Sequence, residues 1–144
     1  MKRKEVWNAA ILAAARVRVK AARQGVWLTA AVLGKYPSCV ESVGQDWMAW
    51  LDAGLIDYAV PMNYTEDGAR YASYVAQQAK SKVRARKIIS GIGVTANESR
   101  LGAVQVMEQV NVARRAGLAG VAFFDLDYTL VNDILPYLRL GLFR

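Results

Sequence analysis

Four short apolar runs, each followed by a segment with helical periodicity, constrain the fold of this chain more than any other feature. The runs occupy residues 26–33, 55–62, 87–93 and 120–124, and they are apolar throughout rather than alternating with polar residues. Uninterrupted apolar runs of this length are typical of strands in a parallel sheet that is covered on both faces. The alternation of such strands with helical segments predicts an α/β fold.

The helical patterns and the length of the chain leave two ways of closing such a sheet. We expect helices at residues 3–24, 46–53, 67–82, 99–116 and 130–139, and a long loop at 34–44. A closed (β/α)8 barrel needs eight strand–helix units and about 250 residues. The chain has four units and 144 residues. The sequence therefore predicts one domain that is either an open doubly wound sheet or half of a barrel.

Two residue counts exclude several kinds of chemistry. The chain has no histidine and one cysteine, Cys39. A Ser-His-Asp or Cys-His triad and a zinc site with imidazole ligands are therefore excluded, and no histidine is present to activate the cysteine thiol. The Gly91-Ile-Gly93 segment is no dinucleotide-binding turn, because the third glycine and the following acidic residue are missing. Any chemistry must rest on carboxylates, hydroxyls, amides, aromatic rings or basic side chains.

The net charge of +7 belongs to the first segment rather than to the whole domain. Residues 1–24 contain seven basic residues and one acidic residue, while the remaining 120 residues carry a net charge of only +1. A second basic group at residues 80–87 suits the C-terminus of a helix. No aromatic residues are interleaved with either group, so we expect no nucleic-acid partner.

The N-terminal segment resembles a signal peptide only in part. The start is basic and residues 6–15 are mostly apolar, but Asn8 interrupts this stretch and basic residues follow it directly. We interpret it as an alanine-rich helix with a basic outer face. No apolar run approaches the roughly 18 residues that a membrane span requires. The localisation of the protein is left open.

Six short segments carry a family resemblance through their order and spacing. They are Leu-Thr-Ala-Ala-Val-Leu-Gly at 28–34, Val-Gly-Gln-Asp-Trp-Met-Ala-Trp at 43–50, Gly-Leu-Ile-Asp-Tyr at 54–58, Pro-Met-Asn-Tyr-Thr at 61–65, Gly-Ile-Gly at 91–93 and Phe-Phe-Asp at 123–125. In this order the chain resembles the C-terminal half of the glycosyl-hydrolase-like family 10 proteins, a (β/α)8-barrel family. The resemblance covers essentially the whole chain.

The resemblance implies a fold and an activity. The fold is half of a (β/α)8 TIM barrel, a single domain over residues 1–144 with four parallel strands that correspond to strands five to eight. The activity is hydrolysis of a polysaccharide or cell-wall glycan by carboxylate acid–base chemistry, with no cofactor and no metal. Family members carry an acidic motif of the Asp-Tyr-x-Arg-Tyr-Pro type on strand four, which would precede Met1. Because glycoside hydrolysis uses two carboxyl groups, we expect this chain alone to be catalytically incomplete.

A half-barrel also suggests a function without catalysis. Half of a barrel leaves two strand edges and an apolar sheet face unpaired, which favours association. The alternative prediction is therefore a non-enzymatic half-barrel that forms a homodimer or docks on a partner carrying the other half.

The carboxyl ends of barrel strands carry the active site, so position along a strand selects the candidate carboxylates. Asp125 ends the fourth strand and is the candidate catalytic residue, with Asp127 as a candidate substrate ligand. The alternative for Asp125 is an N-cap of the last helix. Glu98 is a further candidate substrate ligand, although Thr95-Ala-Asn-Glu98 also fits a capping box, which the spacing favours.

Three further residues are candidates for binding a sugar. Asn63 and Tyr64 follow the second strand, where an amide and a phenol can hydrogen-bond sugar hydroxyls or an N-acetyl group and a ring can stack on a sugar face. The alternative is that Asn63 and Thr65 only form the turn. Tyr36, in the loop at 34–44, is a candidate stacking ring.

Other conspicuous residues are expected to stabilise the fold. Asp57 lies at the opposite end of the second strand, where a buried hydrogen bond fits better than catalysis. Asp46 is expected to cap a helix. Trp47 and Trp50 share one helix face, and Trp27 lies inside a strand, so all three are expected to pack in the core.

Overall fold

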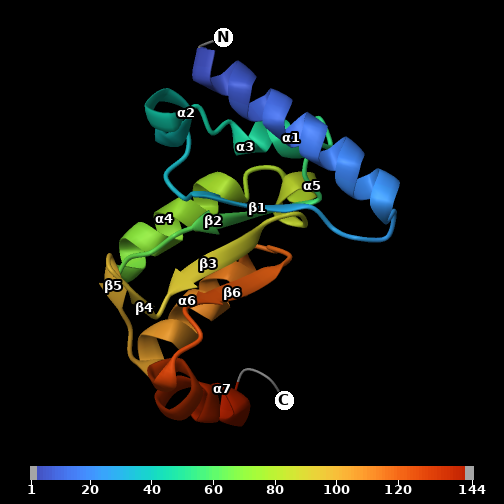
Figure 1. Ribbon diagram of the computed structural model, residues 1–144. Coiled ribbons are helices and arrows are strands. Elements are labelled where there is room, and N and C mark those ends of the chain that lie inside the picture. The colour runs from blue at the N-terminus through green and yellow to red at the C-terminus, as the bar shows by residue number, and fades with distance from the viewer. Residues whose placement is uncertain (1–2, 142–144) are drawn as a thin grey trace.

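The computed structural model describes residues 3–141 and contains a four-stranded parallel sheet (Figure 1). The strands are β1 (Thr29–Leu33), β2 (Tyr58–Met62), β3 (Ile89–Gly93) and β6 (Gly120–Phe124), and they lie in that order across the sheet. The predicted α/β fold with four parallel strands is confirmed. A doubly wound sheet reverses its strand order and has helices on both faces. Neither property is present within residues 3–141, and the sheet there is not closed into a barrel.

Within residues 3–141, eight helical segments and a small hairpin precede, connect or follow the strands. The helices are α1 (Arg3–Ala22), α2 (Ser38–Val43), α3 (Trp47–Asp52), α4 (Gly68–Gln78), α5 (Lys82–Ala85), α6 (Ala103–Arg115), the π-helical segment η1 (Thr129–Ile134) and α7 (Leu135–Gly141). The hairpin consists of β4 (Thr95–Ala96) and β5 (Ser99–Arg100). Helix α4 begins as the sequence suggests, because the Asp67 carboxylate accepts hydrogen bonds from the first backbone N–H groups of the helix.

The start of the helix expected at residues 99–116 is wrong. The β4–β5 hairpin occupies residues 95–100, and α6 begins at Ala103. The side chain of Gln105 accepts a hydrogen bond from the backbone N–H of the N-cap residue Gly102 at 3.0 Å. This bond satisfies one of the backbone N–H groups that have no partner inside the helix. Thr95 and Glu98 therefore form no capping box. The loop expected at 34–44 also differs, since it contains the short helix α2.

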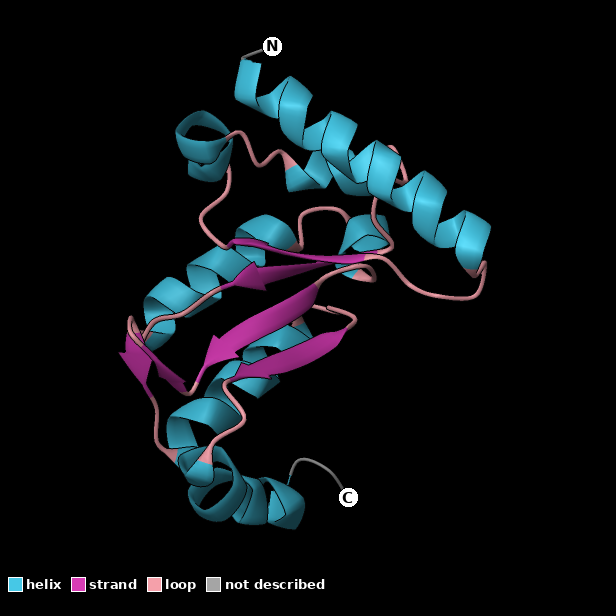
Figure 2. Ribbon diagram, viewed as in Figure 1, coloured by secondary structure: helices cyan, strands magenta, loops and turns pink. Residues whose placement is uncertain are grey.

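One face of the sheet carries the core, beneath α3, α4 and α6 (Figure 2). Around β1 and β2, the buried side chains include Trp47, Leu51 and Ile56. Around β3 and β6, α4 and α6 contribute Tyr71 and Val106. Burial of Trp47 and Trp50 confirms the prediction that both belong to the core.

No helix within residues 3–141 covers the opposite face of the sheet, although Gly93 of β3 lies against Tyr64 and the β4–β5 hairpin. By strand register, this open face consists of Thr29, Ala31 and Leu33 on β1, Tyr58, Val60 and Met62 on β2, Ile89, Gly91 and Gly93 on β3, and Gly120, Ala122 and Phe124 on β6. None of these residues is charged. Leu33 and Phe124 are 39% and 46% exposed. The expectation that the sheet is covered on both faces is therefore wrong for the described part of the chain.

Helix α1 lies near strand β1 and is held mainly by polar contacts. None of its residues is buried. Arg16 and Lys20 contact the two carboxylate oxygens of Asp57 at 3.1 and 2.9 Å, and Asn8 donates to the carbonyl of Val43. Within residues 3–141, no helix is both long and apolar enough to cross a membrane.

Candidate functional site

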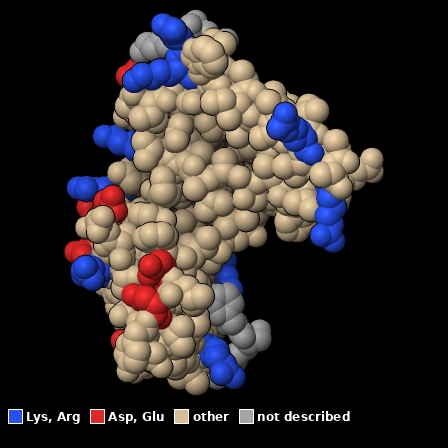
Figure 3. Space-filling view, viewed as in Figure 1, with Lys and Arg blue, Asp and Glu red and all other residues tan. Residues whose placement is uncertain are grey.

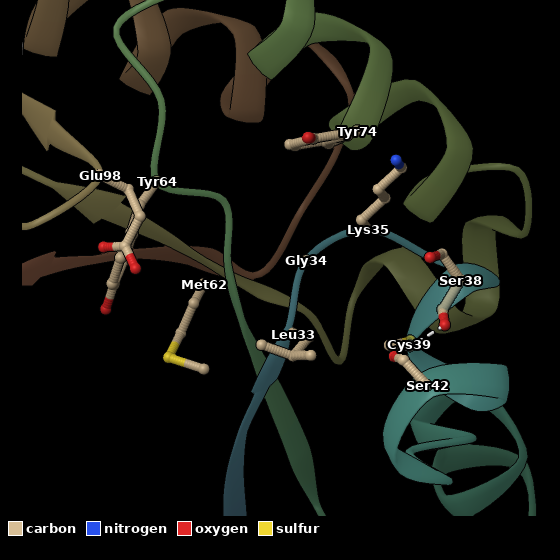
Figure 4. A pocket seen from close by; sticks show the side chains of 10 residues that line it. All are labelled: Leu33, Gly34, Lys35, Ser38, Cys39, Ser42, Met62, Tyr64, Tyr74 and Glu98. Atoms are coloured by element: carbon tan, nitrogen blue, oxygen red, sulfur yellow. Dashed lines mark hydrogen bonds between the residues drawn. The ribbon is translucent and has the colours of Figure 1, made fainter.

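A cavity of about 320 Å³ lies at the carboxyl ends of β1 and β2 (Figure 4). Its floor is apolar, and hydroxyl groups and two charged side chains surround the floor. The lining residues are Leu33, Gly34, Lys35, Ser38, Cys39, Ser42, Met62, Tyr64, Tyr74 and Glu98. An apolar floor with convergent polar groups is typical of small-ligand sites.

Tyr64 extends from the end of β2 across the open face. Two glycines of β3 leave space for its ring: a Cβ atom added at Gly93 would lie 2.8 Å from Tyr64 Cγ, and one added at Gly91 would lie 3.4 Å from Tyr64 Cε1. The ring then stacks on Phe124 of β6, with centroids 5.5 Å apart and planes at 21°. Tyr64, which follows β2, and Phe124 of β6 therefore form one aromatic surface beside the cavity, over the glycines of β3.

Glu98 lies close to this aromatic surface. It is exposed in the turn between β4 and β5 and lines the cavity together with Tyr64 (Figure 4). Burial raises the pKa of the Tyr64 hydroxyl above its ordinary value, and the negative charge of Glu98 raises it further. The structure thus brings together two of the predicted site residues, Tyr64 and Glu98.

Asp125 and Asp127 follow β6, and Thr95 lies between them. The Thr95 hydroxyl donates to Asp125 Oδ1 at 3.2 Å and accepts from the Asp125 N–H at 3.4 Å. Asp127 is the residue that caps the following helix, since its carboxylate accepts from Leu130 N–H at 2.8 Å. That hydrogen bond lowers the pKa of Asp127. Asp125 is exposed and does not act as the N-cap.

Asn63 does not line the cavity, and its surroundings argue against the predicted contact with a substrate. Its side chain is fully buried. Nδ2 donates to Gln78 Oε1 at 3.0 Å and to Ser90 Oγ at 2.9 Å, while Oδ1 accepts from Gln78 Nε2 at 2.8 Å. Gln78 Nε2 also donates to the carbonyl of Gly34. This polar network links β2, β3, α4 and the end of β1 and leaves no amide group for a ligand.

Tyr36 is likewise not one of the residues that line the cavity. It packs edge-on against Trp47, with centroids 5.5 Å apart, and its hydroxyl donates to Asp46 at 3.1 Å. Burial, together with the nearby Asp46 carboxylate, raises the pKa of Tyr36 to about 12. These contacts hold the Tyr36 ring against α3, and its stacking on a sugar stays a prediction. Asp46 accepts from Ala49 N–H and caps α3, as expected.

The structural roles assigned to other residues are partly confirmed. Asp57 accepts from Leu28 N–H at 2.7 Å in addition to its two ion pairs. Burial raises its pKa, but these contacts outweigh burial and lower the pKa to about 2. Cys39 is buried, and burial raises the pKa of its thiol. Trp27 differs from expectation: it is 69% exposed and contacts only the ring of Tyr58 among aromatic neighbours of the described chain.

Several residues of the site were missed by the sequence analysis. Lys35, Ser38 and Tyr74 line the cavity. Tyr74 lies on α4, and nothing in the helical pattern distinguishes it from a surface residue. The two glycines of β3 did offer a sign, because glycine inside a strand marks a place where another group approaches closely.

Comparisons with protein-family models, with curated proteins and with solved structures found no match to this chain. Within residues 3–141, no three His, Cys, Asp or Glu side chains form a group that could hold a metal ion.

Proposed function

We propose that the chain binds a polysaccharide at the carboxyl-end edge of its sheet, as part of a glycoside-hydrolase-like site in a barrel-type fold. The observation that carries this proposal is the stacked Tyr64–Phe124 pair beside the hydroxyl-lined cavity. Aromatic rings bind the apolar face of a sugar, and hydroxyl, ammonium and carboxylate groups bind its hydroxyls. Both kinds of group lie at the strand ends, where (β/α)8 barrels carry their sites.

The barrel-type winding is supported by the topology of the sheet. Strand order follows chain order without reversal, and the helices that cover the sheet lie on one face. That is the arrangement of adjacent strands in a (β/α)8 barrel, where helices surround the outside. On this interpretation the open face is the part of the sheet that would line the barrel interior.

Asp125 is the carboxylate that we propose for acid–base chemistry. It is exposed at the end of β6 and is oriented by the Thr95 hydroxyl. Asp127 is less suited, because its carboxylate is engaged at the start of a helix. Hydrolysis requires a second carboxyl group across the scissile bond, roughly 5–10 Å away. We therefore expect glycan binding by this chain, but no turnover by it alone.

Isothermal titration with soluble chitin oligosaccharides and peptidoglycan fragments tests the proposal. The Tyr64→Ala variant should bind at least about tenfold more weakly, which corresponds to about 1.4 kcal/mol of lost stacking. Tyr137→Ala is the matched control, since Tyr137 is an exposed tyrosine on α7. Absence of binding by the unmodified chain, or equal loss in both variants, would refute the proposal. Release of sugar that disappears in Asp125→Asn would instead show that the chain is catalytically complete.

The non-enzymatic alternative is favoured by a different observation, the uncharged open face of the sheet. Pairing of the chain through this face without any glycan binding would support the non-enzymatic function. Glycan titration therefore discriminates between the two functions.

A further inference from the structure

We propose that two copies of this chain close on each other through their open faces, forming an eight-stranded barrel with β6 of each copy beside β1 of the other. The two-fold axis would run along the barrel. This inference does not depend on the proposed glycan site, because it rests on the sheet edges, the open face and the charge at the two edges.

The sheet has two edges without a neighbouring strand in residues 3–141. Strand β1 pairs only with β2, and β6 pairs only with β3. One edge group of β1 is engaged, because the Gln45 side chain accepts from Leu33 N–H. Unpaired strand edges bind other strands readily. Since all four strands are parallel and eight close a barrel, two copies supply the required number.

Exposed apolar side chains gather where such a pair would close. Trp27, Leu33 and Phe124 lie on or beside the open face. The flanking segments carry more: Val6, Trp7, Ile11 and Val17 on α1, and Leu126, Tyr128 and Val131 directly after β6. The middle of the face seen in Figure 3 carries no charged group, and the Lys, Arg, Asp and Glu side chains lie around it. Apolar patches of this extent mark interaction surfaces.

The total exposed area of the chain is larger than that of a compact monomer. The chain exposes 8620 Å². A compact monomer of its mass, 15.9 kDa, is expected to expose only about 7,400 Å². The excess of roughly 1,200 Å² is more than the approximately 800 Å² that each partner buries in an interface of standard size.

Charge at the two edges favours a second copy over an unrelated partner. Helix α1, near the β1 edge, carries five basic side chains against Glu5 alone. Arg16 and Lys20 are paired with Asp57, which leaves Arg3, Lys4 and Arg18 for the partner copy. Residues 125–134, which follow β6, contain Asp125, Asp127 and Asp133 and no basic residue. In the closed pair the basic edge of each copy meets the acidic edge of the other, at both seams. Such complementarity selects partner and orientation.

Sedimentation velocity of the full chain tests the proposal, with Ala31→Glu as the decisive variant. Ala31 is exposed at the centre of the edge strand β1, on the open face, so the monomer accommodates Glu, whereas the closed pair would bury an unpaired carboxylate. Ala76→Glu on α4 is the matched control, because Ala76 is exposed on a helix that covers the opposite face. We expect about twice 15.9 kDa for the wild type and for the control. The Ala31→Glu variant should dissociate at least about tenfold more readily.

Each other outcome counts against the proposal. A wild-type monomer at all concentrations overturns it and assigns the open face to a different polypeptide. If the Ala31→Glu variant is still a dimer, the dimer forms through another surface. If the molecular mass keeps increasing with protein concentration, the strand edges form open assemblies rather than a closed pair.

Hydrogen exchange of the wild-type chain provides a measurement that needs no variant. Closure predicts that amide protection in β1 and β6 rises with protein concentration, while protection in the inner strands β2 and β3 does not change. Edge strands that exchange rapidly at every concentration would contradict closure.

Discussion

At the scale of single residues, the position of Tyr64 depends on two glycines in the neighbouring strand. Gly93→Ala places a Cβ atom 2.8 Å from Tyr64 Cγ and 2.5 Å from Ser99 Oγ, so the ring or the hairpin must move. We expect a loss of about 1–3 kcal/mol in the free energy of unfolding and weaker glycan binding. Gly120→Ala is the control, because nothing lies within 4 Å of a Cβ at that strand position. Denaturant titration of both variants checks the prediction, and equal stability would contradict it.

The buried amide of Asn63 should matter for stability rather than for ligand binding. Asn63→Ala leaves Oε1 of the buried Gln78 side chain without its hydrogen-bond donor, while Nε2 keeps its bond to the Gly34 carbonyl. An unsatisfied buried polar group and the cavity left behind should cost about 2–4 kcal/mol. Asn97→Ala, at an exposed residue of the β4–β5 turn, should change the unfolding free energy by less than about 0.5 kcal/mol. Comparable unfolding midpoints for the two variants would show that the network is unimportant.

At the scale of elements, Asp57 connects α1 to the start of β1 and should make stability depend on acid. Its pKa is about 2 in the folded chain and 3.8 ordinarily, so folding favours the charged carboxylate. The stabilisation is present above about pH 4 and is lost as the pH falls towards 2. Because the ion pairs are partly exposed, we expect only about 1 kcal/mol. Asp57→Asn should destabilise the chain at pH 6 and have little effect near pH 2, as measured by urea unfolding. A difference that is independent of pH would contradict this account.

The elements also show what the sequence could and could not predict. The strands were found because continuous apolar runs identify buried strands, and helix α4 was found from its helical periodicity, although it ends at Gln78 rather than at residue 82. The hairpin at 95–100 was missed, since two-residue strands have no detectable periodicity and Thr95 with Glu98 mimics a capping box. Asn63 was assigned to the site because it follows a strand. Its burial depends on Gln78, fifteen residues away on α4, and no local pattern reports that contact.

At the scale of the whole molecule, one sheet face carries helices and the other is open. Sequence analysis expected two covered faces, because the strands are apolar on both sides. Apolar side chains on a sheet face indicate that the face is buried in the functional protein. They do not indicate whether the same chain or another chain covers it. The same limit applies to the site, where the ends of the strands were predicted but the side chains that meet there were not.

Chemical-shift mapping during titration with a chitin oligosaccharide tests the central claim most directly. The account predicts that the largest amide and aromatic shifts fall on Tyr64, Phe124, Glu98 and Asp125, at the carboxyl ends of the strands. The buried Asn63 side chain should shift less than the exposed groups around it. Shifts confined to α6 or to the amino-terminal ends of the strands, or no shifts at saturating oligosaccharide, would contradict the assignment of this edge as the functional site.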